Sequence, residues 1–507
     1  MSTTVDMPRA TGREWIGLAV LALPCLLYSM DLTVLHLAVP QLTADLMPSS
    51  SQLLWIVDIY GFLVAGFLIT MGTLGDRIGR RRLLLIGAAA FGAASVLAAF
   101  STSAEMLIAS RAVLGVAAAT LAPSTLSLIR NMFLDPAQRT FAIGIWATSY
   151  SVGAAIGPLL GGLLLQYFWW GSVFLVGVPV MLLLLALGPM LLPEFRDPAS
   201  RRLDVWSAAQ SLAAVLAVIY GLKQITQEGP GWLSMMSIAA GLAIGLAFVR
   251  RQATLGDPLI DLSLFRMPAF SASLATNTLS VFAAFAAFLY IAQYLQLVLD
   301  LSPLQAGLWT VPSSIGFIVG SMSAPALARH VHPAIAVTGG LALAAVGLGL
   351  LALVDGSAGL GVLVAGSVVL ALGVAPVVTL STDLIVGTAP PERAGAASAI
   401  SETGAEFGGA LGIAVLGSIG TAVYRNDMAH ADLKGVTQAA TEAARDTLGG
   451  AVTVARDMHG ELGADVLFAA REAFVQAFET IAVISAAVMV SMAILAVVLL
   501  RRVQVRP

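Results

Sequence analysis

Long apolar runs recur along the whole chain, and short polar connections separate them. Most of these runs reach about 20 residues, which is the length that an α-helix needs to cross the hydrocarbon core of a bilayer. The pattern predicts fourteen spanning helices, near residues 15–39, 53–71, 83–101, 105–129, 140–166, 169–192, 206–226, 232–249, 270–298, 304–328, 334–354, 359–386, 395–423 and 476–500. We therefore expect an all-α polytopic membrane protein.

Three polar segments interrupt or flank this pattern. The predictions place a cytoplasmic N-terminal tail over residues 1–14, a cytoplasmic C-terminal tail over 501–507 and one sizeable loop over 424–475. The loop is rich in acids and has alanine-rich helical spacing, so we expect helical pieces against the outer membrane face. A solvated connector and a gating or substrate-collecting element remain equal alternatives for it.

The basic residues are distributed unevenly between the two sides of the predicted bundle. An even number of spans puts both termini on one side, and most of the 26 lysines and arginines fall in the two tails or in the even-numbered loops. Because cytoplasmic loops carry the excess of positive charge, both termini are predicted to be cytoplasmic. The chain is expected to cross its membrane many times. Lys223, near the outer end of the seventh span, is one of the few exceptions.

Composition excludes several classes of protein. The 507 residues are 58% hydrophobic and only 11% charged. A soluble protein of this size does not need so many apolar residues. The sequence has no basic patch with interleaved aromatic residues, so we expect no nucleic-acid partner. The single cysteine, Cys25, permits no internal disulfide. No metal-ligand spacing, nucleophile elbow or phosphate loop appears, so we expect no metal site, no catalytic residues and no enzyme activity.

A compact basic motif joins the second and third predicted spans. It reads Gly72-Thr-Leu-Gly-Asp-Arg-Ile-Gly-Arg-Arg-Arg82. Arginines beside a span mark the cytoplasmic side, and glycines let two helices approach closely while the chain turns. The spacing favours a conformational motif over a simple topogenic loop, with these residues as candidates: Gly72, Gly75, Asp76, Arg77, Gly79 and Arg80.

Ionisable side chains inside the spans are the main candidates for function, because charge in hydrocarbon is costly. Asp31 lies well inside the first span, where a carboxylate can attract a cation or take a proton. Asp58 lies about one-third into the second span, as a substrate-facing acid or as a structural acceptor. Arg111 lies in the fourth span and requires a carboxylate or carbonyl partner.

Two further acids share one face of the thirteenth predicted span. Glu402 and Glu406 are four residues apart, so their Cβ atoms are expected about 6 Å from each other. Two close carboxylates in a medium of low dielectric constant do not both ionise, and one is expected to keep its proton. A proton carrier needs this property. The alternative for Glu402 is a solvated residue at the cavity entrance.

The fifth predicted span carries small residues at intervals of four. Such spacing brings helices into close contact, and the proline adds a bend. The motif consists of Gly153, Gly157, Pro158, Gly161 and Gly162.

A weak internal repeat suggests two halves. Leu114-Gly-Val116 is followed by Pro136-Ala-Gln-Arg139, and Leu372-Gly-Val374 is followed in the same way by Pro390-Pro-Glu-Arg393. The expected organisation is a six-helix bundle over 15–192, two inserted spans over 206–249 and a second six-helix bundle over 270–500. Chance similarity between Ala/Gly/Leu-rich helices is the alternative.

Together these motifs resemble those of the major facilitator superfamily, in particular its fourteen-helix drug:proton antiporter branch. The resemblance covers essentially the whole chain, and Gly157-Pro158-x-x-Gly161-Gly162 is similar to the antiporter signature of that family. The family's acidic sites map onto Asp31, Asp58, Glu402 and Glu406. The tenth span, 303–329, lacks the carboxylate that some members carry, which puts the handling of divalent cations in question.

The resemblance implies a monomeric exporter in the bacterial plasma (inner) membrane that works by alternating access. The implied substrates are lipophilic cations such as quaternary ammonium compounds, dyes and fluoroquinolones, exchanged for protons that compete for the same carboxylates. The proton motive force would replace any cofactor. The motif at 72–82 would stabilise the outward-open state by pairing across the two halves. Export of an endogenous metabolite or lipid is the alternative function.

Overall fold

A computed structural model describes residues 9–196, 204–229, 231–256, 258–354, 359–389, 394–431, 433, 435–458 and 460–500. Within these ranges the secondary structure is helical throughout, with no strand. Residues 1–8 of the predicted N-terminal tail and the predicted C-terminal tail, 501–507, lie outside the described residues.

The helices in chain order confirm an all-α fold. They are α1 (Gly12–Leu46), α2 (Ser50–Ile78), α3 (Arg80–Ala99), α4 (Ala104–Ala118), α5 (Leu121–Met132), α6 (Pro136–Tyr167), α7 (Ser172–Leu175), α8 (Gly177–Leu191), α9 (Val205–Glu228), α10 (Trp232–Thr254), η1 (Leu264–Arg266), α11 (Pro268–Gln293), η2 (Tyr294–Val298), α12 (Pro303–His330), α13 (Pro333–Leu351), α14 (Gly359–Thr388), α15 (Ala394–His430), α16 (Gln438–Asp446), α17 (Leu448–Met458) and α18 (Glu461–Leu500). Among the described residues, 14 helical segments are long and apolar enough to cross a membrane, which confirms the predicted number.

The connection between the last two spanning helices is shorter than the loop 424–475 that the hydropathy pattern predicts. Helix α15 continues to His430, and α18 already begins at Glu461 rather than near residue 476. Both extensions are polar because they project beyond the apolar layer, and an apolar run therefore underestimates their length. The expected helical pieces between them are α16 and α17.

Helix α16 is held against the end of α15. The Tyr424 hydroxyl donates to the Ala444 carbonyl at 2.8 Å, and the Arg445 guanidinium donates to the Met428 carbonyl at 3.2 Å. Burial raises the pKa of the Asp446 carboxyl, an effect that the nearby Arg425 charge opposes. This segment is thus a packed helical cap rather than a loose connector.

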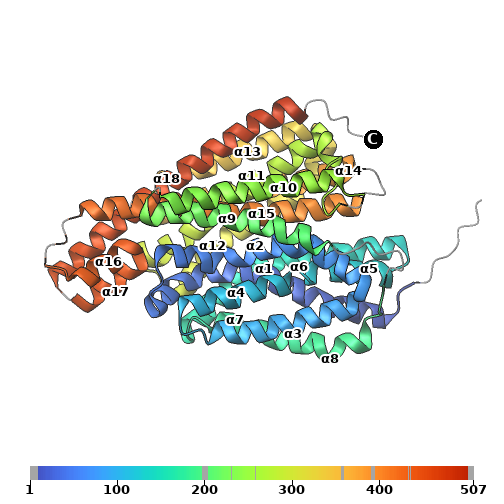
Figure 1. Ribbon diagram of the computed structural model, residues 1–507, viewed down its shortest axis with the longest axis horizontal. Helices are drawn as coiled ribbons and strands as arrows, with labels where there is room; N and C mark the ends of the chain where they lie inside the picture. Colours follow the sequence, from blue (N-terminus) through green and yellow to red (C-terminus); the bar gives the residue numbers. More distant parts are fainter. Residues whose placement is uncertain are drawn as a thin grey trace, which may run out of the picture.

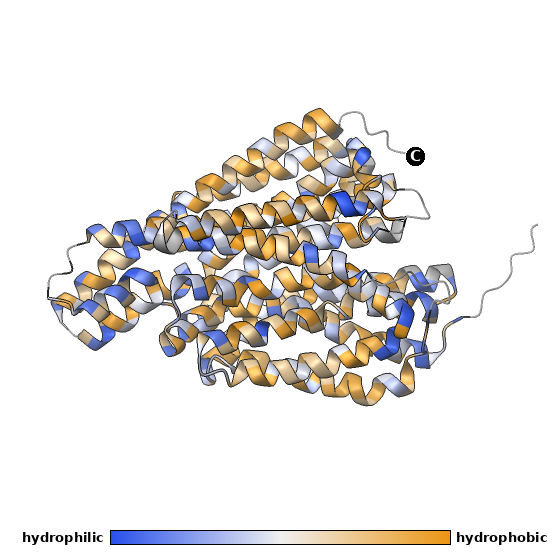
Figure 2. Cartoon of the chain, in the orientation of Figure 1, coloured by the Kyte–Doolittle hydropathy of each residue, from blue (hydrophilic) through white to orange (hydrophobic). Residues whose placement is uncertain are grey.

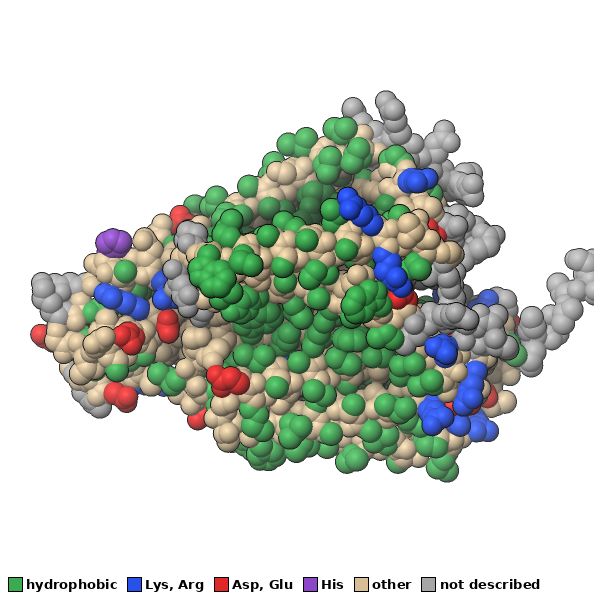
Figure 3. Space-filling view, in the orientation of Figure 1, with side chains coloured by type: hydrophobic (Ala, Val, Ile, Leu, Met, Phe, Trp, Pro, Cys, Tyr) green, Lys and Arg blue, Asp and Glu red, His purple; other side chains and the backbone are tan. Residues whose placement is uncertain are grey.

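The spanning helices form two bundles that lie side by side. Figure 1 shows α1 to α8 in one bundle, with α11, α13, α14, α15 and α18 in the other, while α16 and α17 project at one end. Apolar residues cover the middle of both bundles (Figure 2), and charged side chains gather towards the two ends (Figure 3). An apolar belt between charged ends is the surface that a bilayer requires.

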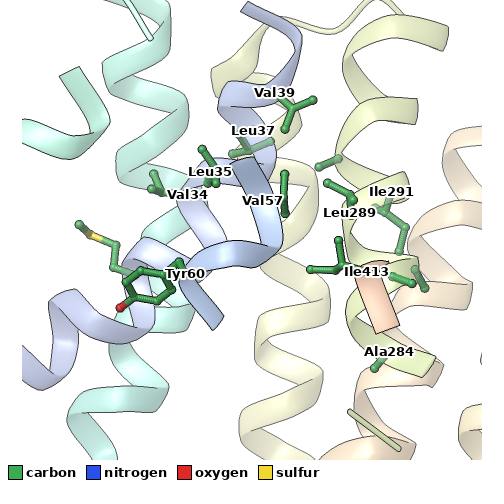
Figure 4. Close-up of a cluster of buried hydrophobic side chains, with 14 of the residues drawn as sticks. Val34, Leu35, Leu37, Val39, Val57, Tyr60, Ala284, Leu289, Ile291 and Ile413 are labelled. Atoms are coloured by element: carbon green, nitrogen blue, oxygen red, sulfur yellow. The ribbon is translucent and has the colours of Figure 1, made fainter. Parts of the chain in front are cut away.

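Buried side chains from both bundles meet in the centre of the molecule (Figure 4). The cluster combines α1, α2, α11 and α15 through Val34, Leu35, Leu37, Val39, Val57, Tyr60, Ala284, Leu289, Ile291 and Ile413. A hydrogen bond also crosses the interface, because the Gln296 amide donates to the Leu37 carbonyl at 3.0 Å. The bundles are therefore in contact near the ends of α1 and η2.

Glycines at intervals of four place α6 directly against α1. A Cβ added at Gly153 would lie 2.2 Å from the Leu26 carbonyl oxygen, and one at Gly161 would lie 2.3 Å from the Val34 side chain. The second bundle repeats this arrangement between α15 and α11. There, added Cβ atoms at Gly408 and Gly412 would lie 2.3 and 2.0 Å from backbone oxygens of α11. The two helix crossings rest on the same small-residue spacing.

The inserted pair α9–α10 covers the seam between the bundles. Ile219 of α9 packs with Phe62 of α2 and with Ala410 and Ala414 of α15. Helix α10 contacts α9 through close glycine approaches, and the Ser237 hydroxyl donates to the Ala217 carbonyl at 2.8 Å. Much of α10 remains exposed, including Trp232 and Leu242. Helix α9 therefore touches both bundles.

Candidate functional site

A buried ion pair joins the first and fourth predicted spans. The Arg111 guanidinium lies 2.6 Å from the Asp31 carboxylate, and only 1% and 10% of the two side chains are exposed. Arg111 also donates to the Ile56 carbonyl at 3.1 Å and lies over the Tyr60 ring at 4.7 Å. The arginine thus has both kinds of partner that the sequence led us to expect, a carboxylate and a carbonyl.

This arrangement fixes α1, α2 and α4 around one neutral pair of charges. Because the guanidinium has several partners, its charge is compensated and its N–H groups are largely occupied. Asp31 is consequently not a free carboxylate in this conformation. A cation that binds there has to compete with Arg111 or meet the pair in a different conformation.

A second buried ion pair connects the inserted helix α9 to α2. The Lys223 ammonium lies 2.9 Å from the Asp58 carboxylate, and at most 2% of either side chain is exposed. The ammonium also lies 3.9 Å from the centre of the Trp55 ring. The sequence did not identify this partner of Asp58. The available signal was a lysine inside an otherwise apolar span, at a position that lies outside the internal repeat.

Glu402 and Glu406 lie on the face of α15 that is turned towards the first bundle. The Glu406 carboxyl lies near Tyr28 of α1, and both acids lie near Tyr150 of α6. Both side chains are partly exposed, and neither forms an ion pair with any described residue. They are therefore acids of the interface whose charge no described basic residue compensates.

Aromatic side chains surround the acids on the first-bundle side. The Tyr28 and Tyr150 ring centroids lie 5.6 Å apart, and Tyr150 also contacts Trp146 at 5.0 Å. The Trp146 indole donates to the Thr125 hydroxyl at 3.0 Å, which fixes the ring. Carboxylates beside aromatic faces provide the chemistry that recognises organic cations. Nothing in the sequence singled out Tyr28 for this wall.

The basic motif at 72–82 forms its ion pairs within the first bundle. Arg80 lies 2.5 Å from Asp76 and also donates to the Pro123 carbonyl of α5 at 3.3 Å. Arg81 pairs with Glu194, which follows α8. Gly79 has a φ of 112°, and a Cβ there would collide with Glu194, so the turn needs a glycine. Among the described residues, the ion pairs of this motif stay within the first bundle, and its pairing across the two bundles in an outward-open state stays a prediction.

The antiporter-like motif of α6 also contacts α12, which packs on α14 of the second bundle through Gly316 and Gly320. A Cβ at Gly162 would lie 2.7 Å from the Pro303 carbonyl oxygen at the start of α12, and one at Gly307 of α12 would lie 2.4 Å from the Pro158 carbonyl oxygen. Pro158 and Gly162 therefore form a close crossing between the bundles, in addition to the contact that Gly153, Gly157 and Gly161 make with α1.

Comparison with known proteins identifies the family. The sequence profile described as Major Facilitator Superfamily matches residues 21–413. The chain belongs to the major facilitator superfamily. The family consists of membrane transporters, which agrees with the expectation that this protein is not an enzyme.

Among similar proteins is the multidrug efflux pump LfrA of Mycolicibacterium smegmatis, 42% identical over 99% of this chain and 100% of its own. The methyl viologen resistance protein SmvA of Salmonella typhimurium is 36% identical over 91% of this chain and 93% of its own. The multidrug resistance protein Stp of Mycobacterium tuberculosis is 30% identical over 77% of this chain and 73% of its own. The expected membership in the drug-exporter branch is confirmed.

Solved structures agree on the fold. A bacterial homologue of the human lysosomal transporter Spinster, in an inward-facing and unoccupied conformation, superposes with a TM-score of 0.68 at 16% identity, covering 98% of this chain and 100% of that one. The nucleoside transporter NupG superposes with a TM-score of 0.60 at 13% identity, over 96% and 99% of the two chains. At these identities the likeness supports the fold alone.

Proposed function

We propose that the protein is a proton-coupled antiporter that exports lipophilic, mostly cationic compounds by alternating access. The observation that carries this proposal is the pair Glu402 and Glu406, two acids without a described ion-pair partner, beside the tyrosines of α1 and α6. Quaternary ammonium compounds and dyes suit this chemistry, with fluoroquinolones as further candidates. The names of LfrA and SmvA, a multidrug pump and a methyl viologen resistance protein, support the same substrate class.

Exchange follows from competition for negative charge. A proton and an organic cation each neutralise one carboxylate, and binding of one removes the attraction for the other. Alternating access then carries the two in opposite directions, with no cofactor beyond the proton motive force. Arg111 keeps the Asp31 carboxylate close to this region, so the pair is a candidate for transmitting the protonation change to the packing of α1, α2 and α4.

The orientation in the membrane belongs to the same proposal. The end of the molecule that carries Arg77, Arg80 and Arg81 is the cytoplasmic one, which puts the α16–α17 cap outside the cell. A monomer in the bacterial plasma membrane, with both termini cytoplasmic, fits this arrangement.

The experiment uses purified protein in liposomes that contain a pH-sensitive dye. With a proton gradient imposed, ethidium is expected to evoke proton movement with the wild type. The E406Q variant is expected to reduce that movement to the protein-free background, because glutamine cannot release a proton. Its affinity for ethidium should also fall, but by less than about tenfold, or about 1.4 kcal/mol, because Glu402 still offers its carboxylate to the cation.

The matched control is E472Q, which removes an exposed acid of α18. This variant is expected to behave as the wild type in both assays. Normal ethidium-evoked proton movement by E406Q would contradict the coupling role of Glu406. If ethidium and other organic cations evoke no movement in well-folded wild-type protein, antiport of cations is wrong.

Export of an endogenous metabolite is the second candidate. The observation in its favour is that a probable actinorhodin transporter of Streptomyces coelicolor is 31% identical over 82% of this chain and 74% of its own. Under this alternative, an aromatic metabolite of that kind should drive proton movement at concentrations at which ethidium does not.

A further inference from the structure

The environment of Lys223 resembles a site for an organic cation. The ammonium lies 2.9 Å from the Asp58 carboxylate and 3.9 Å from the Trp55 ring centre. A carboxylate and an aromatic face are the two groups that bind alkylammonium ligands most effectively. Trp55 and Asp58 are one helical turn apart on α2, so the aromatic face and the carboxylate come from the same helix. The Lys223 side chain reaches them from α9.

The Lys223–Asp58 pair has fewer hydrogen bonds to surrounding groups than the Arg111–Asp31 pair. Arg111 has backbone carbonyls as well as Asp31, whereas neither Asp58 oxygen nor the Lys223 nitrogen has a hydrogen bond with any other described residue. A buried ion pair that lacks further hydrogen bonds recovers less of its desolvation cost. The contact between Lys223 and Asp58 is thus the more readily exchanged of the two.

The end of α9 lies close to Lys223. Glu228, the last residue of α9, is the fifth residue after Lys223 and lies about 7.5 Å from it along the helix axis. A flexible lysine stem spans most of that distance, and lysines near helix ends commonly extend to the membrane surface. Because side chains on a helix lean towards its N-terminus, withdrawal towards Glu228 needs the lysine stem to turn back along α9.

We propose that Trp55 and Asp58 form a subsite for the organic ammonium group of a substrate, and that Lys223 occupies it as an internal competitor. The inference rests on the proposed function, because it assumes that organic cations are substrates. Lys223 and the substrate exclude each other from the subsite. The inserted helix pair thereby takes part in substrate selection, since a compound has to displace the ammonium to bind.

The first test measures the accessibility of Lys223 directly. The chain has two lysines, Lys223 and Lys434, so the K434R variant leaves Lys223 as the only lysine side chain that reductive ¹³C-methylation can label. Ethidium is expected to increase the labelling rate several-fold, because it releases the ammonium from Asp58. In K434R/D58N, labelling should be fast with or without ethidium. An unchanged rate in K434R that still binds ethidium would overturn the proposal.

The second test removes the competitor. In K223M the stem is retained and the charge is lost, so ethidium should bind more tightly, by about tenfold if Lys223 holds the subsite roughly nine-tenths of the time. The gain should disappear in K223M/W55L. Q224M, a change at the next position of α9, is the control and should bind as the wild type.

The outcomes separate this inference from the proposed function. If the wild type exports ethidium while K223M binds it no more tightly than Q224M does, Lys223 only attaches α9 to α2 and the subsite is wrong. A lower melting temperature of K223M with unchanged affinity leads to the same conclusion. If neither the wild type nor K223M binds or moves ethidium, the proposed function fails and the subsite fails with it.

Discussion

The D31N variant is expected to lose substrate-evoked proton movement almost entirely while it stays folded. In the wild type, Asp31 and Arg111 together are neutral, whereas asparagine leaves the Arg111 charge uncompensated in the centre of the first bundle. That charge repels both the organic cation and the proton. A loss of about 100-fold in transport rate, equal to about 2.7 kcal/mol, is the expected size.

Folding should survive because asparagine keeps the shape and can still accept from Arg111. Complete removal of one partner of a buried pair costs about 3–5 kcal/mol, so D31A is expected to be much less stable than D31N. The measurements are ethidium-evoked proton movement in liposomes and the melting temperature in detergent.

Two controls accompany D31N. D45N, on the same helix, changes an exposed acid that accepts from the Trp170 indole, and asparagine can still accept there. It should transport normally. The double variant D31N/R111Q restores neutrality and should recover stability without recovering transport. Efflux at the wild-type rate by D31N would exclude Asp31 from the mechanism.

Replacement of Gly153 by valine is expected to prevent close packing of α6 on α1 and to inactivate the protein. The added Cβ alone would lie 2.2 Å from the Leu26 carbonyl oxygen, which is backbone and cannot rotate away. The helices would have to separate over the whole motif. Overpacking of a tight contact costs about 1–3 kcal/mol and occasionally more, and we expect the upper end of that range here.

The matched control is G144V on the same helix, because a Cβ at Gly144 meets nothing within 4 Å. Both changes raise helix propensity in the same way, because valine is a better helix former than glycine, so their difference isolates the helix contact. G144V should retain most of the transport and stability of the wild type. Equal behaviour of the two variants would show that the close contact of α6 with α1 is dispensable.

Hydropathy was sufficient to predict the spans because each of them has to satisfy its backbone within an apolar layer. The same signal failed at the C-terminal end of α15 and the N-terminal end of α18, since it reports depth in the membrane and not helix length. The helix in 461–475 continues in polar sequence, where only periodicity and alanine content could have revealed it.

The candidate site was predictable one residue at a time but not as a set of pairs. The cost of buried charge identified Asp31, Asp58 and Arg111, and the four-residue spacing identified Glu402 with Glu406. Pairing of Asp58 with Lys223 depends on where α9 lies, and the insert has no counterpart in the internal repeat that could locate it. The roles of all these acids stay predictions.

Helix α10 gives the surrounding lipid a direct contact with the transporter. Its 23 residues span about 35 Å, slightly more than the typical 30 Å hydrocarbon thickness, and most of its surface is exposed. A thinner bilayer would be accommodated by tilting α10, and α9 is the neighbour that would bear the strain. Acyl-chain length is therefore a variable to hold fixed when variants of this protein are compared in liposomes.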